Sequence, residues 1–304
     1  MKNALLRMHA AVLLWGFTGI LGRAISLDAP VLVWYRMLLT AAFMAVILTF
    51  RKQWVRIRRR DMRRLVLIGC LIGLHWVAFY GSVKFANASV ALICLSTASI
   101  FVSLLDPLVN RSRYDLRELL LGMLAIVGVY LIYRFQSFYG KGIAYGIVAA
   151  VLSAVFTVLN KRIAGKYPVR PMVFYEMAAG WVLISLILAV LLVSGLEGLL
   201  LSPDNTTGSL LLTPLPADWL WLAVLSLCCT VWAQSLALSA LKRLSAFTVT
   251  LSVNMEPVYG ILLAFVFFRE NKELHPGFFI GMALICLSVV LQMLRLIRFH
   301  PPKR

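Results

Sequence analysis

The sequence has few charged residues and, among these, very few acidic ones. Of its 304 residues only 14% are charged, and 12 Asp and Glu stand against 30 Lys and Arg. A water-soluble domain of this length cannot bury a chain that is 62% hydrophobic, whereas a bilayer requires spans of about 20 apolar residues. The scarcity of charge therefore indicates an integral membrane protein.

The sequence also lacks the motifs of metal and nucleophilic chemistry. The four histidines form no H-E-x-x-H pair, and neither G-x-S-x-G nor a P-loop occurs. The five cysteines have no metal-ligand spacing and fall within apolar runs, as small buried hydrophobic residues do. We therefore expect no cofactor, no metal and no enzymatic activity. A membrane-embedded enzyme or a receptor is a remote alternative.

Ten long apolar runs alternate with charged or turn-rich segments. Each run is continuous rather than alternating in polarity, which predicts transmembrane helices and not barrel strands. The predicted fold class is an all-α membrane protein with ten transmembrane helices. Their predicted ranges are residues 5–24, 31–50, 63–83, 88–108, 116–134, 142–161, 172–194, 218–240, 246–268 and 277–297.

The basic residues predict how these helices are oriented. With the N-terminus inside, most Lys and Arg fall on the cytoplasmic side, as short cytoplasmic loops require, and the densest cluster runs from Arg51 to Arg64. We predict a multi-pass protein of the plasma (inner) membrane with N- and C-termini in the cytoplasm. A net charge of +18 fits loops that face phospholipid, so the lipid bilayer is the expected partner and nucleic acid is not.

Two segments of the chain resemble each other. The stretch VLVWYRM, Val31–Met37, returns as PMVFYEM, Pro171–Met177, with Glu176 where the first copy has Arg36. Each half of the chain holds five predicted helices, and because five is odd the second half must begin on the opposite side of the membrane. The sequence therefore predicts two inverted five-helix repeats, residues 1–137 and 138–304, around a central cavity.

Three motifs in the sequence resemble those of a known family. They are LLWGFTGIL in the first predicted helix, YRMLL in the second and NMEPVYGILLAFVFFRE in the ninth. With ten spans in two halves, the chain resembles the drug/metabolite transporter superfamily, EamA family, over essentially its whole length. The resemblance implies export or exchange of amino acids and other small metabolites. It also implies that helices 1 to 4 and 6 to 9 surround the cavity while helices 5 and 10 are peripheral.

Glu256 is the strongest candidate for the site. It falls about ten residues into the ninth predicted helix, near the bilayer centre, where a carboxylate is costly and usually faces a cavity or a partner. Pro257 follows it and predicts a kink that frees a backbone carbonyl for gating. Ser252 and Tyr259 share its helical face. The alternative is a Glu256 that pairs with a basic residue only to hold the kink.

Arg36 lies slightly above the midplane, within side-chain reach of a ligand at Glu256, and its guanidinium group matches carboxylate geometry. Alternatively, it extends to the outer interface or pairs structurally with an acid. Its counterpart Glu176 is a candidate for an inner gate or for coupling. Alternatively, Glu176 only pairs structurally with Lys166 or Arg170.

Other candidates lie near mid-span. His75 and Trp76, with Tyr80 one turn further, form a polar and aromatic group, although a lone membrane histidine can simply bond a neighbouring helix. Ser96 and Ser99 belong to a serine stripe that either lines the cavity or lets helices pack closely. Residues that favour an aromatic, partly polar cavity wall are Trp15, Phe156, Thr157, Asn160, Trp232 and Gln234.

A site with an arginine, a carboxylate, a histidine and aromatic walls suits a small zwitterion. We therefore predict a secondary active or facilitative transporter that exports an amino acid or similar small metabolite by alternating access. Glu256 would bind the substrate amine or a coupling proton. The alternative is an exporter of cationic drugs or nucleoside-like metabolites, in which Arg36 is structural. The sequence predicts no oligomeric state.

Overall fold

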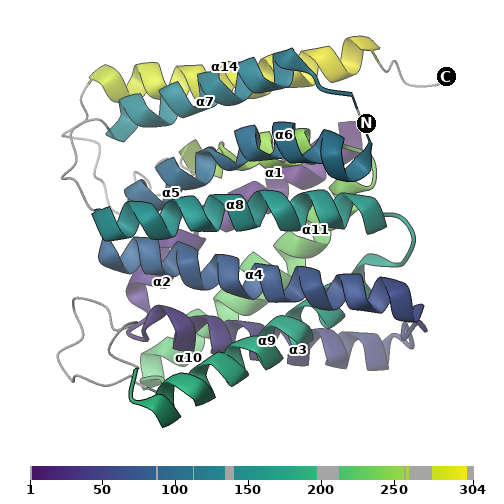
Figure 1. Cartoon of the computed structure of the whole chain (residues 1–304), viewed down its shortest axis with the longest axis vertical. Coiled ribbons are helices and arrows are strands. Elements are labelled where there is room, and N and C mark those ends of the chain that lie inside the picture. The colour runs from purple at the N-terminus through teal and green to yellow at the C-terminus, as the bar shows by residue number, and fades with distance from the viewer. Residues whose placement is uncertain are drawn as a thin grey trace.

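The protein is a bundle of long helices that lie roughly parallel in stacked layers (Figure 1). The computed structural model describes residues 2–86, 88–111, 113–133, 140–196, 212–256, 258–259 and 276–299. Within these ranges every regular element is a helix. The elements are α1 (Lys2–Gly16), α2 (Thr18–Ala24), α3 (Ala29–Phe50), α4 (Arg59–Phe85), α5 (Ala88–Ser96), α6 (Ala98–Asn110), α7 (Leu116–Tyr133), α8 (Gly140–Ile163), α9 (Val169–Ser194), α10 (Pro216–Ser226), the π-helical turn η2 (Leu227–Trp232), α11 (Ala233–Leu241), α12 (Ala246–Val253) and α14 (Pro276–Phe299).

Seven segments of the described chain are long and apolar enough to cross a bilayer. Their outward faces carry exposed large apolar side chains, for example Phe50 and Val193, which lipid and not water would cover. The all-α, multi-pass membrane fold is therefore confirmed. The seven spans are Lys2–Gly22, Ala29–Phe50, Arg59–Phe85, Val90–Asn110, Gly140–Ile163, Val169–Ser194 and Pro216–Leu241.

The other three predicted spans are not among these seven. The fifth corresponds to α7, and the tenth corresponds to α14, whose apolar segment Phe279–Arg295 is shorter than the seven spans. Helices α7 and α14 pack against each other at one edge of the bundle (Figure 1). Residues 260–268 of the ninth predicted span lie outside the described residues.

The core of the bundle is built by close packing of α4 against α8 and α9, and of α3 against α9. Glycines allow the closest approaches. A Cβ atom added to Gly69 of α4 would overlap the backbone carbonyl oxygen of Glu176 in α9. The two helices can therefore touch only because this position has no side chain.

Polar residues form hydrogen bonds between the ends of neighbouring helices. At the end of the bundle that holds residues 25–28, Asp218 accepts hydrogen bonds from the backbone N–H groups of Leu215 and Ser26, 3.0 Å each, and from the Ser26 hydroxyl. Asp218 thereby caps the start of α10 and fixes the α2–α3 loop against it. At the other end, the Lys161 ammonium group donates to the carbonyl oxygens of Leu241 and Leu244.

Four of the helical segments that cross the bundle are interrupted near their middle. Phe17 separates α1 from α2, and Thr97 separates α5 from α6. The π-helical turn η2 separates α10 from α11, and α12 ends at Val253. In contrast α3, α4, α8 and α9 are continuous for 22, 27, 24 and 26 residues. The backbone at Phe17 and Thr97 keeps helical angles, so these helices are irregular there and not unwound.

Candidate functional site

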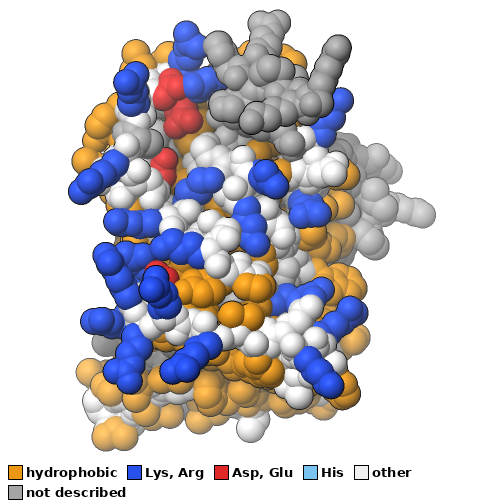
Figure 2. Space-filling model, turned by 90° about the vertical axis from the view of Figure 1, so that its right-hand side faces the viewer, with side chains coloured by type: hydrophobic (Ala, Val, Ile, Leu, Met, Phe, Trp, Pro, Cys, Tyr) orange, Lys and Arg blue, Asp and Glu red, His pale blue; other side chains and the backbone are white. Residues whose placement is uncertain are grey.

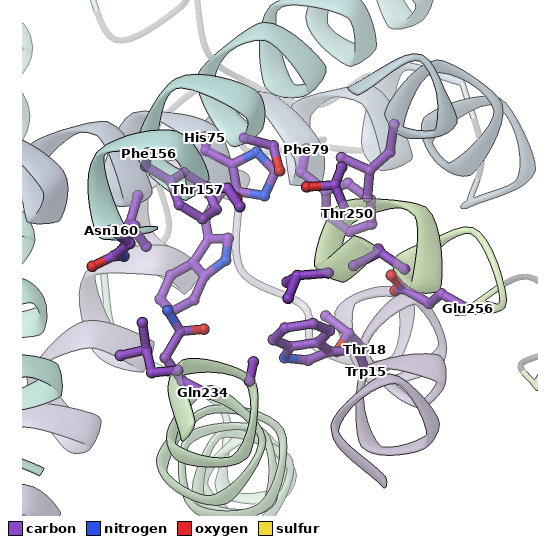
Figure 3. Close-up of a pocket in the computed structure, with 18 of the residues that line it drawn as sticks. Trp15, Thr18, His75, Phe79, Phe156, Thr157, Asn160, Gln234, Thr250 and Glu256 are labelled. Carbon is purple, nitrogen blue, oxygen red and sulfur yellow. The ribbon is translucent and has the colours of Figure 1, made fainter. Parts of the chain in front are cut away.

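An interior cavity of about 100 Å³ lies where the interrupted and continuous helices meet. Figure 3 shows side chains from α1, α2, α4, α8, α11 and α12 arranged around it. The cavity is small beside ligand pockets of roughly 300–1,000 Å³, which suits a small solute. Its lining residues are Trp15, Thr18, Arg36, Ile72, His75, Trp76, Phe79, Leu95, Ser153, Phe156, Thr157, Asn160, Gln234, Ala237, Leu238, Leu241, Val249, Thr250, Val253 and Glu256.

Arg36 is held rigidly at the cavity wall. Its Nε donates to the Thr230 hydroxyl at 2.9 Å, one terminal nitrogen donates to the Tyr80 hydroxyl at 2.9 Å, and the other donates to the Cys229 carbonyl at 3.4 Å. The guanidinium carbon lies 3.8 Å from the centre of the Trp76 ring. Only 1% of Arg36 is exposed, so this side chain does not extend to the outer interface. A cation stacked on an aromatic face with three acceptors is preorganised.

The π-helical turn supplies two of these acceptors. Within Leu227–Trp232 the Thr230 hydroxyl donates to the Leu225 carbonyl five residues back at 3.0 Å. The Cys229 carbonyl also accepts a hydrogen bond of 3.1 Å from the indole N–H of Trp15. A wide turn of this kind exposes carbonyl groups that a regular α-helix would use internally, and such turns are frequent at functional sites. Here the turn positions a cation and an aromatic ring of the cavity.

Glu256 faces the cavity from the far side of a helix break. Helix α12 ends at Val253, and the Asn254 N–H bonds the Leu251 carbonyl three residues back at 3.1 Å. The Glu256 carboxyl group lines the cavity and is 6% exposed (Figure 3). It interacts electrostatically with Arg36, but within the described ranges no ion pair joins them. A guanidinium group and a carboxyl group therefore line one cavity without a direct ion pair.

His75 lines the cavity and also bonds a neighbouring helix. Its Nδ1 atom lies 2.8 Å from the Ala149 carbonyl oxygen of α8, so Nδ1 carries the proton and Nε2 is the acceptor in a neutral ring. The ring lies edge-on to Phe156, with centroids 5.3 Å apart, and stacks on Phe79. This geometry is compatible with both interpretations of His75, and its role in binding stays a prediction.

The structure brings together nine of the residues proposed from the sequence. They come from three helices of the first half and from α8, α11 and the segment after α12, and they surround one space (Figure 3). Their role in binding stays a prediction. The nine are Trp15, Arg36, His75, Trp76, Phe156, Thr157, Asn160, Gln234 and Glu256.

Other proposed residues lie away from the cavity lining. Tyr80 lies behind Arg36 as its hydrogen-bond partner. Ser99 donates to the Ser96 carbonyl at 3.0 Å, and both are buried between helices, as the packing alternative expects. Trp232 ends the π-helical turn and is 54% exposed on the outside of the bundle, because the wide turn shifts the helical register.

The polar stripe predicted along the ninth helix is used for packing. The Ser252 hydroxyl donates to the Thr248 carbonyl at 2.8 Å. The Thr248 hydroxyl accepts a hydrogen bond of 3.0 Å from the side-chain amide of Gln292 in α14. The Tyr259 hydroxyl lies 2.9 Å from Nδ1 of His9. These hydroxyls satisfy neighbouring helices, and Thr250 and Val253 face the cavity instead. Pro257, proposed as a gating kink, lies outside the described residues, as does Gly260.

Glu176 is fully buried and is not among the residues that line the central cavity. Neither carboxyl oxygen has a hydrogen-bond partner in the described part of the chain. The Asn160 amide lies close enough to interact with it, although the geometry is not that of a hydrogen bond. Asn160 itself lines the cavity, so one residue separates Glu176 from the cavity.

The expected structural partners of Glu176 are occupied elsewhere. Lys166 forms an ion pair of 3.6 Å with Asp61. Arg170 donates to the Gln53 side chain at 2.7 Å. A pairing of Glu176 with either cation is therefore not seen.

Three polar lining residues were not singled out from the sequence as binding residues. Thr18 follows the break at Phe17, and Ser153 lies one turn before Thr157 on α8. Thr250 lies on the face of α12 opposite the expected stripe. The spacing of Ser153, Thr157 and Asn160 on one helical face was a signal that could have identified Ser153.

The fold and the largely apolar cavity with a few polar and charged groups define a helical membrane protein with an interior solute-sized site. The chain belongs to the EamA-like transporter family: its model matches residues 2–134 and again residues 140–294. This confirms the resemblance drawn from the sequence, and the family is one of transporters and not of enzymes.

Two similar proteins accompany this match. An uncharacterized transporter of Haemophilus influenzae is 25% identical over 151 residues, which cover 46% of this chain and 49% of that protein. The chain thus matches about half the length of this curated relative. A solved crystal structure is similar with a TM-score of 0.72 and 19% identity, covering 99% of both chains. That likeness shows the shared fold.

Proposed function

We propose that the protein is an alternating-access transporter that exports an amino acid or a similar small zwitterion. Its ten spans would form two inverted five-helix repeats, residues 1–137 and 138–304, in the inner membrane with both termini in the cytoplasm. The observation that carries the proposal is the placement of Arg36 and Glu256 at one small cavity without a direct ion pair. A zwitterion complements such a site, with its carboxylate at Arg36 and its amine at Glu256.

The helix directions support the inverted arrangement. Helix α3 starts at the end of the bundle that holds residues 25–28, and α9 starts at the opposite end, so the two run antiparallel (Figure 1). The matching motifs around Arg36 and Glu176 therefore lie at opposite depths, as symmetry about an axis in the membrane plane requires.

The interrupted helices support alternating access. The breaks at Phe17, Thr97 and Val253 and the π-helical turn lie along the paths that carry cavity residues. Segments on either side of a break can tilt as separate units, which lets one half of the bundle move against the other around a central site.

Transport by purified protein in liposomes tests the proposal. Liposomes loaded with an unlabelled amino acid should take up the same labelled amino acid by exchange, and Glu256→Gln should reduce this exchange at least about tenfold. A proton-sensitive dye inside the liposomes separates the two roles of Glu256: coupled proton movement marks a proton site, and exchange without it marks amine binding. Normal exchange by Glu256→Gln with an unchanged pH profile would exclude both roles.

One observation favours a second candidate, a transporter of cationic drugs or nucleoside-like metabolites. Three hydrogen bonds and the Trp76 ring engage Arg36, as in a purely structural role. A competition experiment in liposomes distinguishes the two candidate functions. If Arg36 binds the substrate carboxylate, an amine that lacks a carboxylate should compete poorly with the labelled amino acid. Equal competition by the amino acid and its decarboxylated analogue would favour the cationic substrate.

A further inference from the structure

A second hollow of about 510 Å³ lies at the end of the bundle where α4 begins and α8 ends. It shares no lining residue with the central cavity. Five of its six lining residues are basic, and the sixth is an aspartate. They are Arg58, Arg60, Asp61, Arg64, Arg162 and Lys166.

Asp61 binds several side chains on one side of this hollow. It is buried and forms ion pairs with Arg64 at 3.1 Å and with Lys166 at 3.6 Å, and it accepts a hydrogen bond of 3.0 Å from the Tyr167 hydroxyl. The loop after α8 is thereby fixed against the first turn of α4. Part of the lining of the hollow is therefore held in place by ion pairs and a hydrogen bond to one buried carboxylate.

The positive charge of the hollow exceeds what Asp61 balances. In the described ranges no ion pair involves Arg58, Arg60 or Arg162. The backbone at Arg58 also starts a helix of 27 residues, whose first N–H groups attract anions. Five cations around one carboxylate leave a site whose complement is an anion with several acceptor oxygens.

The surroundings favour phosphate chemistry. Figure 2 shows Lys and Arg side chains spread over this end of the bundle, with few acidic groups among them and apolar side chains nearby. Helices α3, α4, α8 and α9 all end or begin here, so this face lies at the level of lipid headgroups, where anionic phospholipids attract basic segments. Arginine side chains match phosphate oxygens with paired donors.

We propose that this hollow is a binding site for a phosphate group, which an anionic phospholipid headgroup or a free phosphate ion supplies. The bound anion joins the start of α4 to the end of α8, because Arg60 and Arg162 line the same hollow. The site is independent of the transported substrate and of the proposed function.

The chain offers a matched control for this proposal. Arg58 and Arg60 line the hollow, whereas Arg56 and Arg59 belong to the same basic segment and do not line it. All four side chains are exposed, so neutral substitutions should preserve folding. The double variants Arg58→Gln/Arg60→Gln and Arg56→Gln/Arg59→Gln remove the same charge from the same segment and differ only at the hollow.

The experiment measures binding of phosphatidylglycerol to the purified full chain in neutral detergent, with phosphatidylcholine as the comparison lipid. We expect wild type to prefer phosphatidylglycerol, the hollow variant to bind it at least about tenfold more weakly, and the control variant to bind it as wild type does. Equal weakening by both variants would overturn the proposal, and so would equal binding of the two lipids by a wild-type protein that also binds no inorganic phosphate.

Inorganic phosphate identifies the source of the anion. If millimolar phosphate displaces phosphatidylglycerol from wild type but not from the hollow variant, the site accepts the free ion. If phosphate does not compete while the lipid still distinguishes the two variants, the site requires the headgroup on its lipid. Melting temperatures of both variants without ligand verify their folding, and Arg60→Gln alone repeats the test with the smallest change.

Discussion

Arg36 and Glu176 occupy matching positions on two long helices. Helix α3 begins at Ala29 and α9 at Val169, so each charged residue lies seven residues inside its helix. Arg36 reaches a cavity and has three hydrogen-bond acceptors and a ring face around it. Glu176 does not line that cavity, and its carboxyl oxygens have no hydrogen-bond partner among the described residues.

The difference shows that a repeated backbone does not imply repeated chemistry. Close packing of α4 against α9 encloses Glu176, while a π-helical turn in the α10–α11 path opens toward Arg36. The repeat fixes where each side chain starts, and the neighbouring helices decide whether it meets solute or protein. Variants at these two positions and their neighbours test this interpretation.

The largest effect should come from the helix contact beside Glu176. Gly69→Ala would place a methyl group on the Glu176 backbone carbonyl, which cannot move away as a side chain can. Overpacking of this kind costs about 1–3 kcal/mol or more, so the melting temperature and the yield of folded protein should fall sharply.

Gly73, one turn along the same helix, provides the control. A Cβ atom there would lie 3.4 Å from side-chain atoms of Ile184 and Met37, which can adjust. Because Ala favours helix over Gly by about 1 kcal/mol, Gly73→Ala should be neutral or stabilising. Equal melting temperatures for the two variants would contradict the close contact at Glu176.

Removal of the Arg36 charge should have the next largest effect. Arg36→Leu deletes the cation and leaves the Tyr80 and Thr230 hydroxyls without their donor. Hydrogen bonds to charged groups contribute about 1.5–3 kcal/mol, so exchange of a zwitterion in liposomes should fall about 10- to 100-fold. A variant that folds normally and retains full exchange would show that Arg36 is structural and would favour a cationic substrate.

An intermediate effect is expected at the π-helical turn. Thr230→Val keeps the side-chain shape but removes the acceptor for Arg36 Nε and the bond to the Leu225 carbonyl. We expect the KM for a zwitterion to rise about threefold to tenfold, because loss of one such bond changes binding by about 1 kcal/mol. Thr230→Ser restores the hydroxyl and should restore the KM. An unchanged KM in Thr230→Val would separate the turn from substrate binding.

Much of the fold follows from the sequence because bilayer physics leaves few choices. Long apolar runs must form helices when no water satisfies the backbone. The seven spans in the described residues each overlap a predicted one. The interruptions were harder to predict: no proline marks the breaks at Phe17 or Thr97, and the π-helical turn in Leu227–Trp232 has no sequence signal that we recognise.

The candidate site, like the fold, can be predicted only in part from the sequence. Arg36, His75 and Glu256 were found because charged or titratable groups at membrane depth are costly and usually face polar surroundings. Helical spacing alone makes Ser252 and Tyr259 cavity candidates and leaves Ser99 between cavity lining and packing, and the structure has all three bonded to neighbouring backbone or helices. Hydroxyls can satisfy themselves locally, so their position on a helix does not reveal whether they face a cavity.

Glu176→Gln should have the smallest effect. The amide has nearly the same shape as the carboxyl group, and the Asn160 side-chain oxygen beside it also lacks a hydrogen-bond partner in the described ranges. The new N–H donor can bond that oxygen without moving a helix, so the melting temperature should stay equal or rise slightly.

Exchange in liposomes by Glu176→Gln should remain within about twofold of wild type, whereas Glu256→Gln in the same preparation should lose it. Both acids are buried, but of the two only Glu256 lines the central cavity. The two variants therefore compare a buried acid at the cavity with a buried acid away from it. If Glu176→Gln folds normally but loses exchange, the carboxyl group acts in gating or coupling, as its position in the repeat first suggested. In that case Asn160, which touches both the cavity and Glu176, is the residue through which the two communicate.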